Sequence, residues 1–266
     1  MKPISIHPLF ALFIFALPAN GAVVELFNFS DAAGTGLANT ANTGTVGTAW
    51  NFNVNGQPGE AATDGNGILW IGANATAGSS TISSDYTRKV TFATTITDGD
   101  FMFEYRLASW NLDDTGALNA AHDQEGITIR LNTGAGDSLS LITALNATSA
   151  NVRARHSGAG LVTATAGQTN IGFTGSDLVV RVSGNLTTGA FTTSYNPGGA
   201  GFTNIITDGA GLVDIKEIVM FIEGGTAGWS STDSAGIDYI SLTAIPEPSA
   251  ALLGGLGLLA LLRRRR

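Results

Sequence analysis

Asp123 and Glu125 stand one residue apart, and they are the residues whose spacing most resembles a catalytic pair. If this segment is extended, both side chains lie on the same side of the strand. Two carboxylates about 5–10 Å apart can act as the acid and the base or nucleophile of glycoside hydrolysis. However, Gly126, Ile127 and Thr128 follow, so no further carboxylate continues the pattern. A polar loop that leads into a strand explains the same residues, and we predict no catalytic residue.

Calcium binding is a second chemistry that clustered loop oxygens can perform. Three acidic pairs are candidates: Asp98 with Asp100, Asp113 with Asp114, and Asp233 with Asp238. Turn formation explains the first pair better than calcium binding does. Asp113 and Asp114 lie in the longest polar segment, residues 111–125, close to Asp123. If the protein uses a calcium cofactor, we expect this pair to bind it.

Tryptophan rings offer a third chemistry, because an exposed ring can stack on the apolar face of a sugar. Trp110 opens the acidic segment, and Trp229 lies in the Gly-rich and Ser-rich stretch GGTAGWSSTDSAG. We predict these two residues as ligand-binding candidates, with a packing role as the alternative for each. Trp70 lies in an apolar run and is predicted to be in the core.

Several other chemistries are excluded or disfavoured. The chain has no cysteine, which excludes thiol catalysis and zinc–thiolate sites. It has no G-x-S-x-G nucleophile elbow, and His122 and His156 have no zinc-binding partner at a typical spacing. We predict that Arg153, Arg155 and His156 together form a solvated strand end.

The elements that must position these residues are strands. No segment keeps an apolar period of 3.6, whereas Val90, Phe92, Thr94 and Ile96 alternate in Arg88–Thr97. Phe101–Leu107 alternates in the same way after Asp98-Gly99, which predicts a hairpin at that pair. Further strands are predicted at Val23–Phe29, Gly67–Ile71, Gly126–Leu131, Ser138–Leu145, Asn151–Arg155, Leu178–Ser183, Ala190–Tyr195, Ile215–Ile222 and Ile237–Thr243. Turns are predicted at Asn55-Gly56, Asp64-Gly65 and Asp208-Gly209. The sequence therefore predicts an all-β, antiparallel sandwich or barrel.

The stretches VVELFNFSD, LVVRVSGNLTTGAF and GIDYISLT, in this order, resemble a concanavalin A-like jelly roll of the legume-lectin and laminin-G kind. The resemblance implies an antiparallel β-sandwich in which the first and last strands pair. Val24 and Leu26 would then lie near Ile240 and Leu242. Glucanases of this fold carry Glu-x-Asp-x-x-Glu on one strand. At Asp123–Glu125 the first acid of that motif is changed in type and the third is absent.

The two ends of the chain have compositions of their own. Residues 1–21 combine Lys2, an apolar run at 9–17 and a small-residue cleavage site, which predicts a secretory signal peptide. Between the ends, residues 22–245 form one predicted domain with 8 basic and 20 acidic residues, a net charge near −12. This charge makes nucleic acid a poor partner, whereas neutral glycans or divalent cations fit better.

The C-terminal segment, residues 246–266, begins with Pro246, Glu247 and Pro248 and ends with four arginines, Arg263, Arg264, Arg265 and Arg266. Between them lie 14 uncharged residues, about 21 Å of helix against a hydrocarbon core of about 30 Å. This order resembles the PEP-CTERM sorting signal of exported proteins of Gram-negative bacteria, many of which make exopolysaccharide. The resemblance implies that an exosortase removes a tail that holds the chain only transiently in the inner membrane.

Together these features predict an exported, non-enzymatic protein of the cell surface or extracellular matrix, with polysaccharide as a candidate partner. The alternative is a carbohydrate-active enzyme, a glycoside hydrolase or polysaccharide lyase, in the same fold. A structural role without any ligand is also open.

Overall fold

The computed structural model describes residues 23–35, 51–53, 61–72, 86–112, 125–146, 149–157, 165–223 and 233–245. All of them belong to one unit that spans Ala22–Glu247. The predicted signal peptide and the C-terminal segment 246–266 lie outside these ranges. Within the described part of the chain, no helix has the length and apolar character that a membrane span requires.

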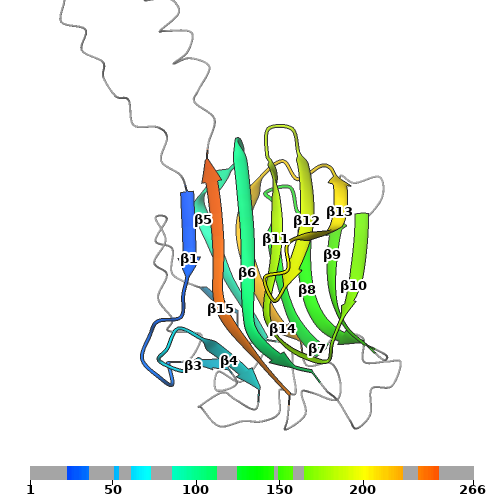
Figure 1. The fold of residues 1–266 in the computed structure, drawn as a ribbon. Coiled ribbons are helices and arrows are strands. Elements are labelled where there is room, and N and C mark those ends of the chain that lie inside the picture. Colours follow the sequence, from blue (N-terminus) through cyan, green and yellow to red (C-terminus); the bar gives the residue numbers. More distant parts are fainter. Residues whose placement is uncertain are drawn as a thin grey trace, which may run out of the picture. The chain divides into compact units, whose positions relative to one another are not determined.

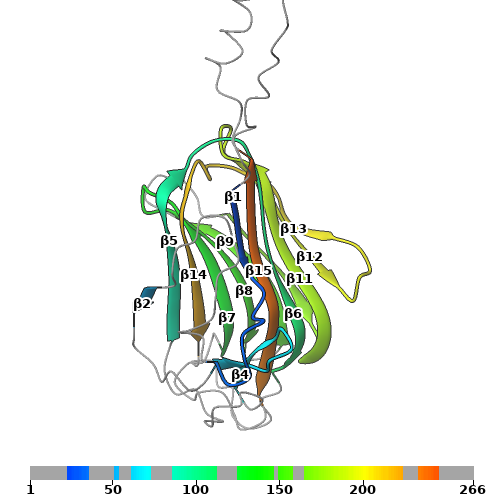
Figure 2. The same ribbon diagram turned by 90° about the vertical axis from the view of Figure 1, so that its left-hand side faces the viewer.

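The described residues form two antiparallel sheets (Figures 1 and 2). Sheet A has the order β13-β12-β11-β6-β15-β4-β3, and β1 pairs with β15; sheet B has the order β10-β9-β8-β7-β14-β5-β2. The strands of sheet A are β1 (Val23–Phe27), β3 (Ala61–Thr63), β4 (Leu69–Gly72), β6 (Asp100–Asn111), β11 (Thr174–Asn185), β12 (Ala190–Pro197), β13 (Thr203–Gly209) and β15 (Ser234–Ile245). Those of sheet B are β2 (Asn51–Asn53), β5 (Tyr86–Ile96), β7 (Glu125–Asn132), β8 (Ser138–Asn146), β9 (Ser149–Ser157), β10 (Thr165–Ile171) and β14 (Ile215–Glu223).

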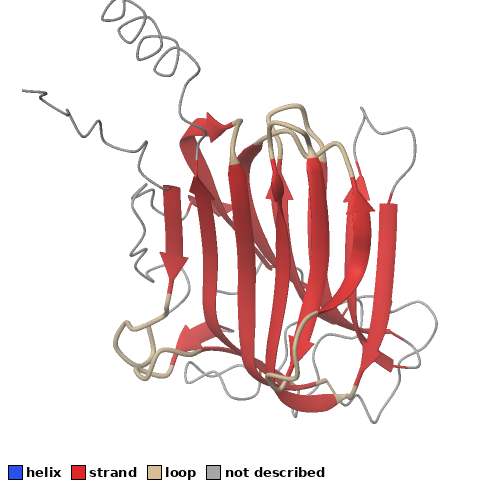
Figure 3. Ribbon diagram, turned by 45° about the horizontal axis from the view of Figure 1, so that its top comes forward, coloured by secondary structure: helices blue, strands red, loops and turns tan. Residues whose placement is uncertain are grey.

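Alternating side chains build the core between the sheets. In β6, Phe103, Tyr105 and Leu107 are fully buried, whereas the residues between them are partly exposed. Ile127, Ile129 and Leu131 of β7 are their counterparts in sheet B. Successive residues of a strand therefore lie on opposite sides of its sheet, as the period of two dictates. The all-β sandwich is confirmed, and Figure 3 shows strands and loops throughout the described residues.

The pairing of the first and last strands is confirmed. Val24 lies opposite Thr243 and Leu26 opposite Ser241, one residue along from the predicted neighbours Leu242 and Ile240. This closure is the one expected for the jelly roll, because the chain begins and ends side by side in sheet A.

The predicted hairpin at Asp98-Gly99 is wrong. β5 pairs with β14 and β2 in sheet B, whereas β6 pairs with β11 and β15 in sheet A. The turn therefore carries the chain from one sheet to the other. Gly99 has a φ of 83°, and its carbonyl accepts a hydrogen bond from the amide of Leu186 at 2.9 Å. The Asp-Gly pair permits a sharp reversal, but partner strands decide which sheet each arm joins.

The predicted turn at Asp64-Gly65 is confirmed between β3 and β4. The carboxylate of Asp64 accepts hydrogen bonds from the amides of Asn66 and Ile68 at 2.7 and 3.1 Å. Desolvation opposes ionisation here, but these bonds outweigh it and lower the pKa of Asp64. The predicted turn at Asp208-Gly209 instead lies at the end of β13, and Asn55-Gly56 lies outside the described residues.

Four strands of the structure were not predicted: β2, β3, β10 and β13. Their sequences are NFN, AAT, TAGQTNI and TNIITDG, which lack a clear apolar alternation. They lie at the edges of the two sheets, where a strand needs little apolar area of its own.

Candidate functional site

The side of sheet B that faces away from the core carries many polar side chains: Arg155, Gln168 and Asn170 are exposed, whereas Thr128, Ser140 and Asn151 are buried. On its central strand β7, the positions that alternate with the core residues hold Gly126, Thr128, Arg130 and Asn132. The register extends these positions across the sheet. We define the outer face of sheet B by the described residues on this side: Thr91, Gly126, Thr128, Arg130, Asn132, Ser138, Ser140, Ile142, Ala144, Asn151, Arg153, Arg155, Ala166, Gln168, Asn170, Glu217, Val219 and Phe221.

Arg130 lies at the centre of this face. Its guanidinium carbon is 4.5 Å from the centre of the Phe221 ring, and its Nε donates a hydrogen bond to Ser140 Oγ at 3.1 Å. These two contacts fix the direction of a long side chain that otherwise loses considerable entropy on ordering. The face therefore has a positioned cation and an aromatic ring at its middle.

A single carboxylate, Glu217, lies among the described side chains of the outer face of sheet B. It accepts hydrogen bonds from Thr91 Oγ1 at 2.9 Å and from Asn132 Nδ2 at 3.3 Å. Beside it, a hollow of about 310 Å³ is lined by Arg130, Asn132, Thr133, Gly136, Asp137, Ser138, Lys216 and Glu217. The hollow combines two cationic and two acidic residues with amide and hydroxyl groups, which suits a polar ligand.

The outer side of sheet A has a different electrostatic arrangement. Arg181 pairs with Glu104 at 2.8 Å, and Tyr239 donates a hydrogen bond to the other oxygen of that carboxylate. Burial, reinforced by this carboxylate, raises the pKa of Tyr239. Arg106 binds two carboxylates, those of Asp177 and Asp238. The backbone of Asp177 is in the left-handed region, with a φ of 57°. In this conformation its carboxylate accepts a hydrogen bond from Arg106 Nε. The cations of this face are thus matched by carboxylates.

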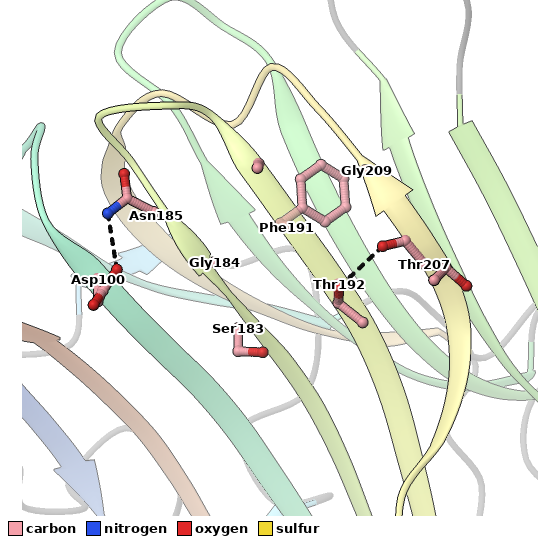
Figure 4. Close-up of a pocket in the computed structure, with 9 residues that line it drawn as sticks. Asp100, Ser183, Gly184, Asn185, Phe191, Thr192, Thr207 and Gly209 are labelled. Carbon is pink, nitrogen blue, oxygen red and sulfur yellow. Dashed lines mark hydrogen bonds between the residues drawn. The ribbon is translucent and has the colours of Figure 1, made fainter.

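A second hollow, of about 550 Å³, lies where β11 and β13 end and where β6 and β12 begin (Figure 4). Its lining comprises Asp100, Ser183, Gly184, Asn185, Ala190, Phe191, Thr192, Thr207 and Gly209. Asn185 Nδ2 donates to Asp100 Oδ1 at 2.8 Å, and Thr192 Oγ1 donates to the carbonyl of Thr207 at 3.0 Å. A Cβ at Gly209 would approach the Phe191 ring to 2.3 Å, so the glycine is needed for the ring to pack there.

The structure places Trp110 in the core. Only 6% of its surface is exposed, and its Nε1 donates a hydrogen bond to the carbonyl of Gly172 at 2.8 Å. The ring lies so close to Gly175 that a Cβ there would come within 2.2 Å of Cζ2. The ring therefore offers no open face for a sugar to stack on, and packing, the alternative that we weighed, describes this residue. The prediction that Trp70 lies in the core is wrong, because Leu69 and Ile71 take the core positions of β4 and Trp70 is half-buried on the outer side of sheet A, over Gly236.

The prediction that His156 lies at a solvated strand end is wrong. It is fully buried rather than solvated, and its ring meets the Phe191 ring edge-on at 5.0 Å between the centroids. Desolvation lowers the pKa of His156. Arg155, one residue earlier on β9, is exposed. Alternation explains the difference, because His156 lies on the core side of the strand and Arg155 on the outer side.

The remaining predicted site residues are only partly located. Glu125 begins β7 opposite Leu145, at the alternation shared with the core residues Ile127 and Ile129. The other predicted positions lie outside the described residues: Asp113, Asp114, Asp123, Trp229, Pro246, Glu247, Pro248, Arg263, Arg264, Arg265 and Arg266. Among the described residues, no group of three or more His, Asp or Glu side chains could hold a metal ion.

Comparison with known proteins identifies the C-terminal segment. Residues 244–266 match the family model described as the PEP-CTERM protein-sorting motif. The chain ends in a PEP-CTERM sorting signal. This signal implies export and processing by an exosortase. The match begins at Ala244, one residue before β15 ends, so the sorting signal follows the last strand of the sandwich directly.

A solved structure with a similar fold confirms the architecture. An endo-1,3-beta-glucanase from Streptomyces sioyaensis is 14% identical, with a TM-score of 0.51 over 86% of this chain and 99% of its own. The basic winged bean lectin with Tn-antigen is 9% identical, with a TM-score of 0.49 over 84% of this chain and 98% of the lectin. At such identities the likeness to the glucanase establishes the jelly roll and nothing about activity. No curated protein matches the sequence.

Sequence reasoning missed the outer face of sheet B as a site. The alternation of Arg153 and Arg155 on one strand was visible, because residues two apart share a face. Their neighbourhood with Arg130 was not, since it depends on the pairing of β9 with β8 and of β8 with β7.

Proposed function

We propose that this exported protein is a non-enzymatic carbohydrate-binding protein of the cell surface or extracellular matrix, and that it binds polysaccharide on the outer face of sheet B. The observation that carries the proposal is the composition of that face. Guanidinium, amide and hydroxyl groups surround one half-buried aromatic ring, that of Phe221. Such groups donate and accept the hydrogen bonds that sugar hydroxyls need, while a ring packs against sugar C–H groups.

The same face argues against hydrolysis. The outer positions of the central strand β7 are occupied by glycine, threonine, arginine and asparagine. A glycosidase needs two carboxylates on opposite sides of the scissile bond. Among the described residues of this face, Glu217 is the one carboxylate, and it is engaged by Thr91 and Asn132. We therefore expect binding without turnover.

Affinity electrophoresis of the exported protein through gels that contain single polysaccharides tests this function. We expect retardation by at least one polysaccharide, and no release of reducing ends from any of them. Gln168→Ala removes an exposed amide from the outer face of sheet B and should weaken retardation severalfold. Ser183→Ala, an exposed change in the second hollow on sheet A, is the matched control and should bind as the unmodified protein does.

Three results would refute the proposal in whole or in part. Migration unaffected by every polysaccharide tested would refute carbohydrate binding. Loss of retardation in Ser183→Ala but not in Gln168→Ala would move the site to the hollow of Figure 4. Release of reducing ends that Glu125→Gln abolishes would establish the alternative, a carbohydrate-active enzyme.

A further inference from the structure

The strands at the edges of the two sheets differ in how readily another chain could pair with them. Among the described strands, the edges of sheet B are β2 and β10, and those of sheet A are β13, β3 and β1. An edge strand presents backbone N–H and C=O groups that have no neighbouring strand. Proteins usually protect such a strand by making it short, charged or bulged, or by covering it.

Four of these edge strands carry protection of this kind. β2 and β3 have three residues each. β1 has five residues and includes the acidic residue Glu25. The pairing of β13 with β12 is interrupted by two register shifts, and β13 includes Asp208. None of these four strands offers an edge that is long, regular and uncharged.

The fifth edge strand, β10, is different. Its seven residues, TAGQTNI, include no charged residue and no proline. All seven pair with β9 in an antiparallel register without a shift. No other described strand pairs with β10, which is the last strand of sheet B (Figure 1). The edge of β10 that faces away from β9 is therefore regular over the whole length of the strand.

Contacts inside the sandwich hold β10 in place. The carbonyl oxygen of Ile205 in β13 lies so close to Gly167 that a Cβ there would come within 2.3 Å of it. The hydroxyl groups of Thr169 and Tyr195 are 3.4 Å apart and share a hydrogen bond. Both contacts lie on the side of β10 opposite to the exposed residue Gln168, because successive residues alternate. The strand is thus ordered before a partner arrives, so pairing would cost little further ordering.

The strand is also complementary to a second copy of itself. In an antiparallel pair of two β10 strands, a two-fold axis at Gln168 places Gly167 of one copy opposite Thr169 of the other. All seven residues then find a partner residue. No like charges face each other, because the segment is uncharged. Such an interface uses the same patch on both copies and closes after two of them.

We propose that β10 is a dimerisation strand, with which a second copy of this chain pairs antiparallel across a two-fold axis at Gln168. The two copies of sheet B then form one continuous sheet, and their outer faces lie side by side. The association is weak, because seven residues a side make a small interface and because each copy has a predicted net charge near −12. Salt screens this repulsion and strengthens the dimer. Dimerisation itself does not depend on carbohydrate binding.

Sedimentation equilibrium of the exported protein, without polysaccharide, measures the association. We expect the average mass to rise with protein concentration from that of one chain toward twice that value. At a fixed concentration it should rise further between about 50 and 500 mM sodium chloride. Hydrogen exchange at low and high protein concentration locates the contact. Amides of β10 should exchange more slowly in the dimer, whereas those of β13 should not change.

Charges placed at Gln168 test the symmetry of the pair. Residues directly opposite in an antiparallel pair have Cβ atoms about 4.5–5.5 Å apart, so like charges there are unfavourable. Gln168→Lys and Gln168→Glu should each weaken association severalfold, and an equimolar mixture of the two should restore it, because lysine then faces glutamate. Asn204→Lys, an exposed change on β13, alters the net charge as Gln168→Lys does and is the matched control. Its association should stay within twofold of that of the unmodified protein. Thermal melting verifies that each variant is folded.

The outcomes separate this inference from the proposed function. The mass of one chain at every protein and salt concentration overturns the dimer. Unchanged association in both Gln168 variants, or a loss in Asn204→Lys alone, overturns the location. Two variants that stay weak when mixed overturn the two-fold pairing, and a mass that grows well beyond two chains overturns the closed interface. A protein that dimerises as expected but binds no polysaccharide refutes the proposed function and supports the dimer.

Discussion

Replacement of Trp110 by alanine separates core packing from sugar contact at this position. Its ring is 6% exposed, packs against Gly175 and donates a hydrogen bond to the carbonyl of Gly172. Truncation of such a ring costs about 3–5 kcal/mol, through lost burial and the cavity left behind. For a domain of this size each kcal/mol corresponds to about 2–4 °C. Trp110→Ala should therefore lower the melting temperature by roughly 6–20 °C.

Trp110→Phe isolates the hydrogen bond from the packing. Phenylalanine keeps most of the apolar ring but leaves the Gly172 carbonyl without this donor. A buried polar group that loses its partner costs about 1–3 kcal/mol, so the phenylalanine variant should melt between the alanine variant and the unmodified protein. Differential scanning calorimetry measures all three proteins.

Polysaccharide binding is measured on the same proteins below their melting temperatures. We expect folded Trp110→Phe to bind as the unmodified protein does. An unchanged melting temperature in Trp110→Ala, together with lost binding, would contradict this account and restore Trp110 as a sugar contact. Trp229→Ala, at a residue outside the described part, is measured in the same way for comparison. If the Trp229 ring stacks on a sugar, this variant should lose polysaccharide binding while its melting temperature stays unchanged.

Three further predictions follow from particular contacts. His156 has a lowered pKa because it is buried, so as the pH falls the unfolded chain takes up this proton first. Stability should be unaffected above about pH 6.5 and fall below it by at most about 1.4 kcal/mol per pH unit; equal acid sensitivity of the melting temperature in His156→Leu would contradict this. Tyr105→Phe breaks the 2.7 Å hydrogen bond between the Tyr105 hydroxyl and Thr143 that joins β6 to β8, and denaturant titration should show a loss of about 1–3 kcal/mol that the added change Thr143→Val partly restores. Glu247→Ala should leave an unprocessed chain in the inner-membrane fraction, and mature mass and location identical to those of the unmodified protein would refute the role of this residue in sorting.

The strands with clear alternation could be predicted, because a period of two records which side of a strand is buried. β5 and β6 show the limit of this signal. Each was identified from its own residues, yet the Asp98-Gly99 turn between them joins two sheets. Both arms bury one side in either arrangement, so the pattern cannot distinguish a hairpin from a crossing. Pairing is decided by partners far away in the chain, such as β14 for β5 and β11 for β6.

The candidate site was harder to predict than the fold. His156 was assigned to a solvated strand end because arginines precede it, whereas its alternation places it in the core against Phe191. Arg155 and Arg130 are brought to the same side of sheet B by pairing across three strands, and no local sequence window contains both. The C-terminal sorting signal, in contrast, is contiguous in the chain, and residues alone sufficed to identify it.

The junction between β15 and the sorting signal suits a domain that is released intact. β15 pairs with β6 from its first residue, Ser234, to its last, Ile245, and with β1 from Ile240 to Ala244. Pro246 follows at once, and a proline has no amide proton with which to continue the ladder. Removal of the tail beyond this proline would break none of the strand pairings of the sandwich. The stability of the domain should therefore be the same before and after processing. The outer face of sheet B, built from β5, β7, β8, β9, β10 and β14, includes no residue of the sorting signal.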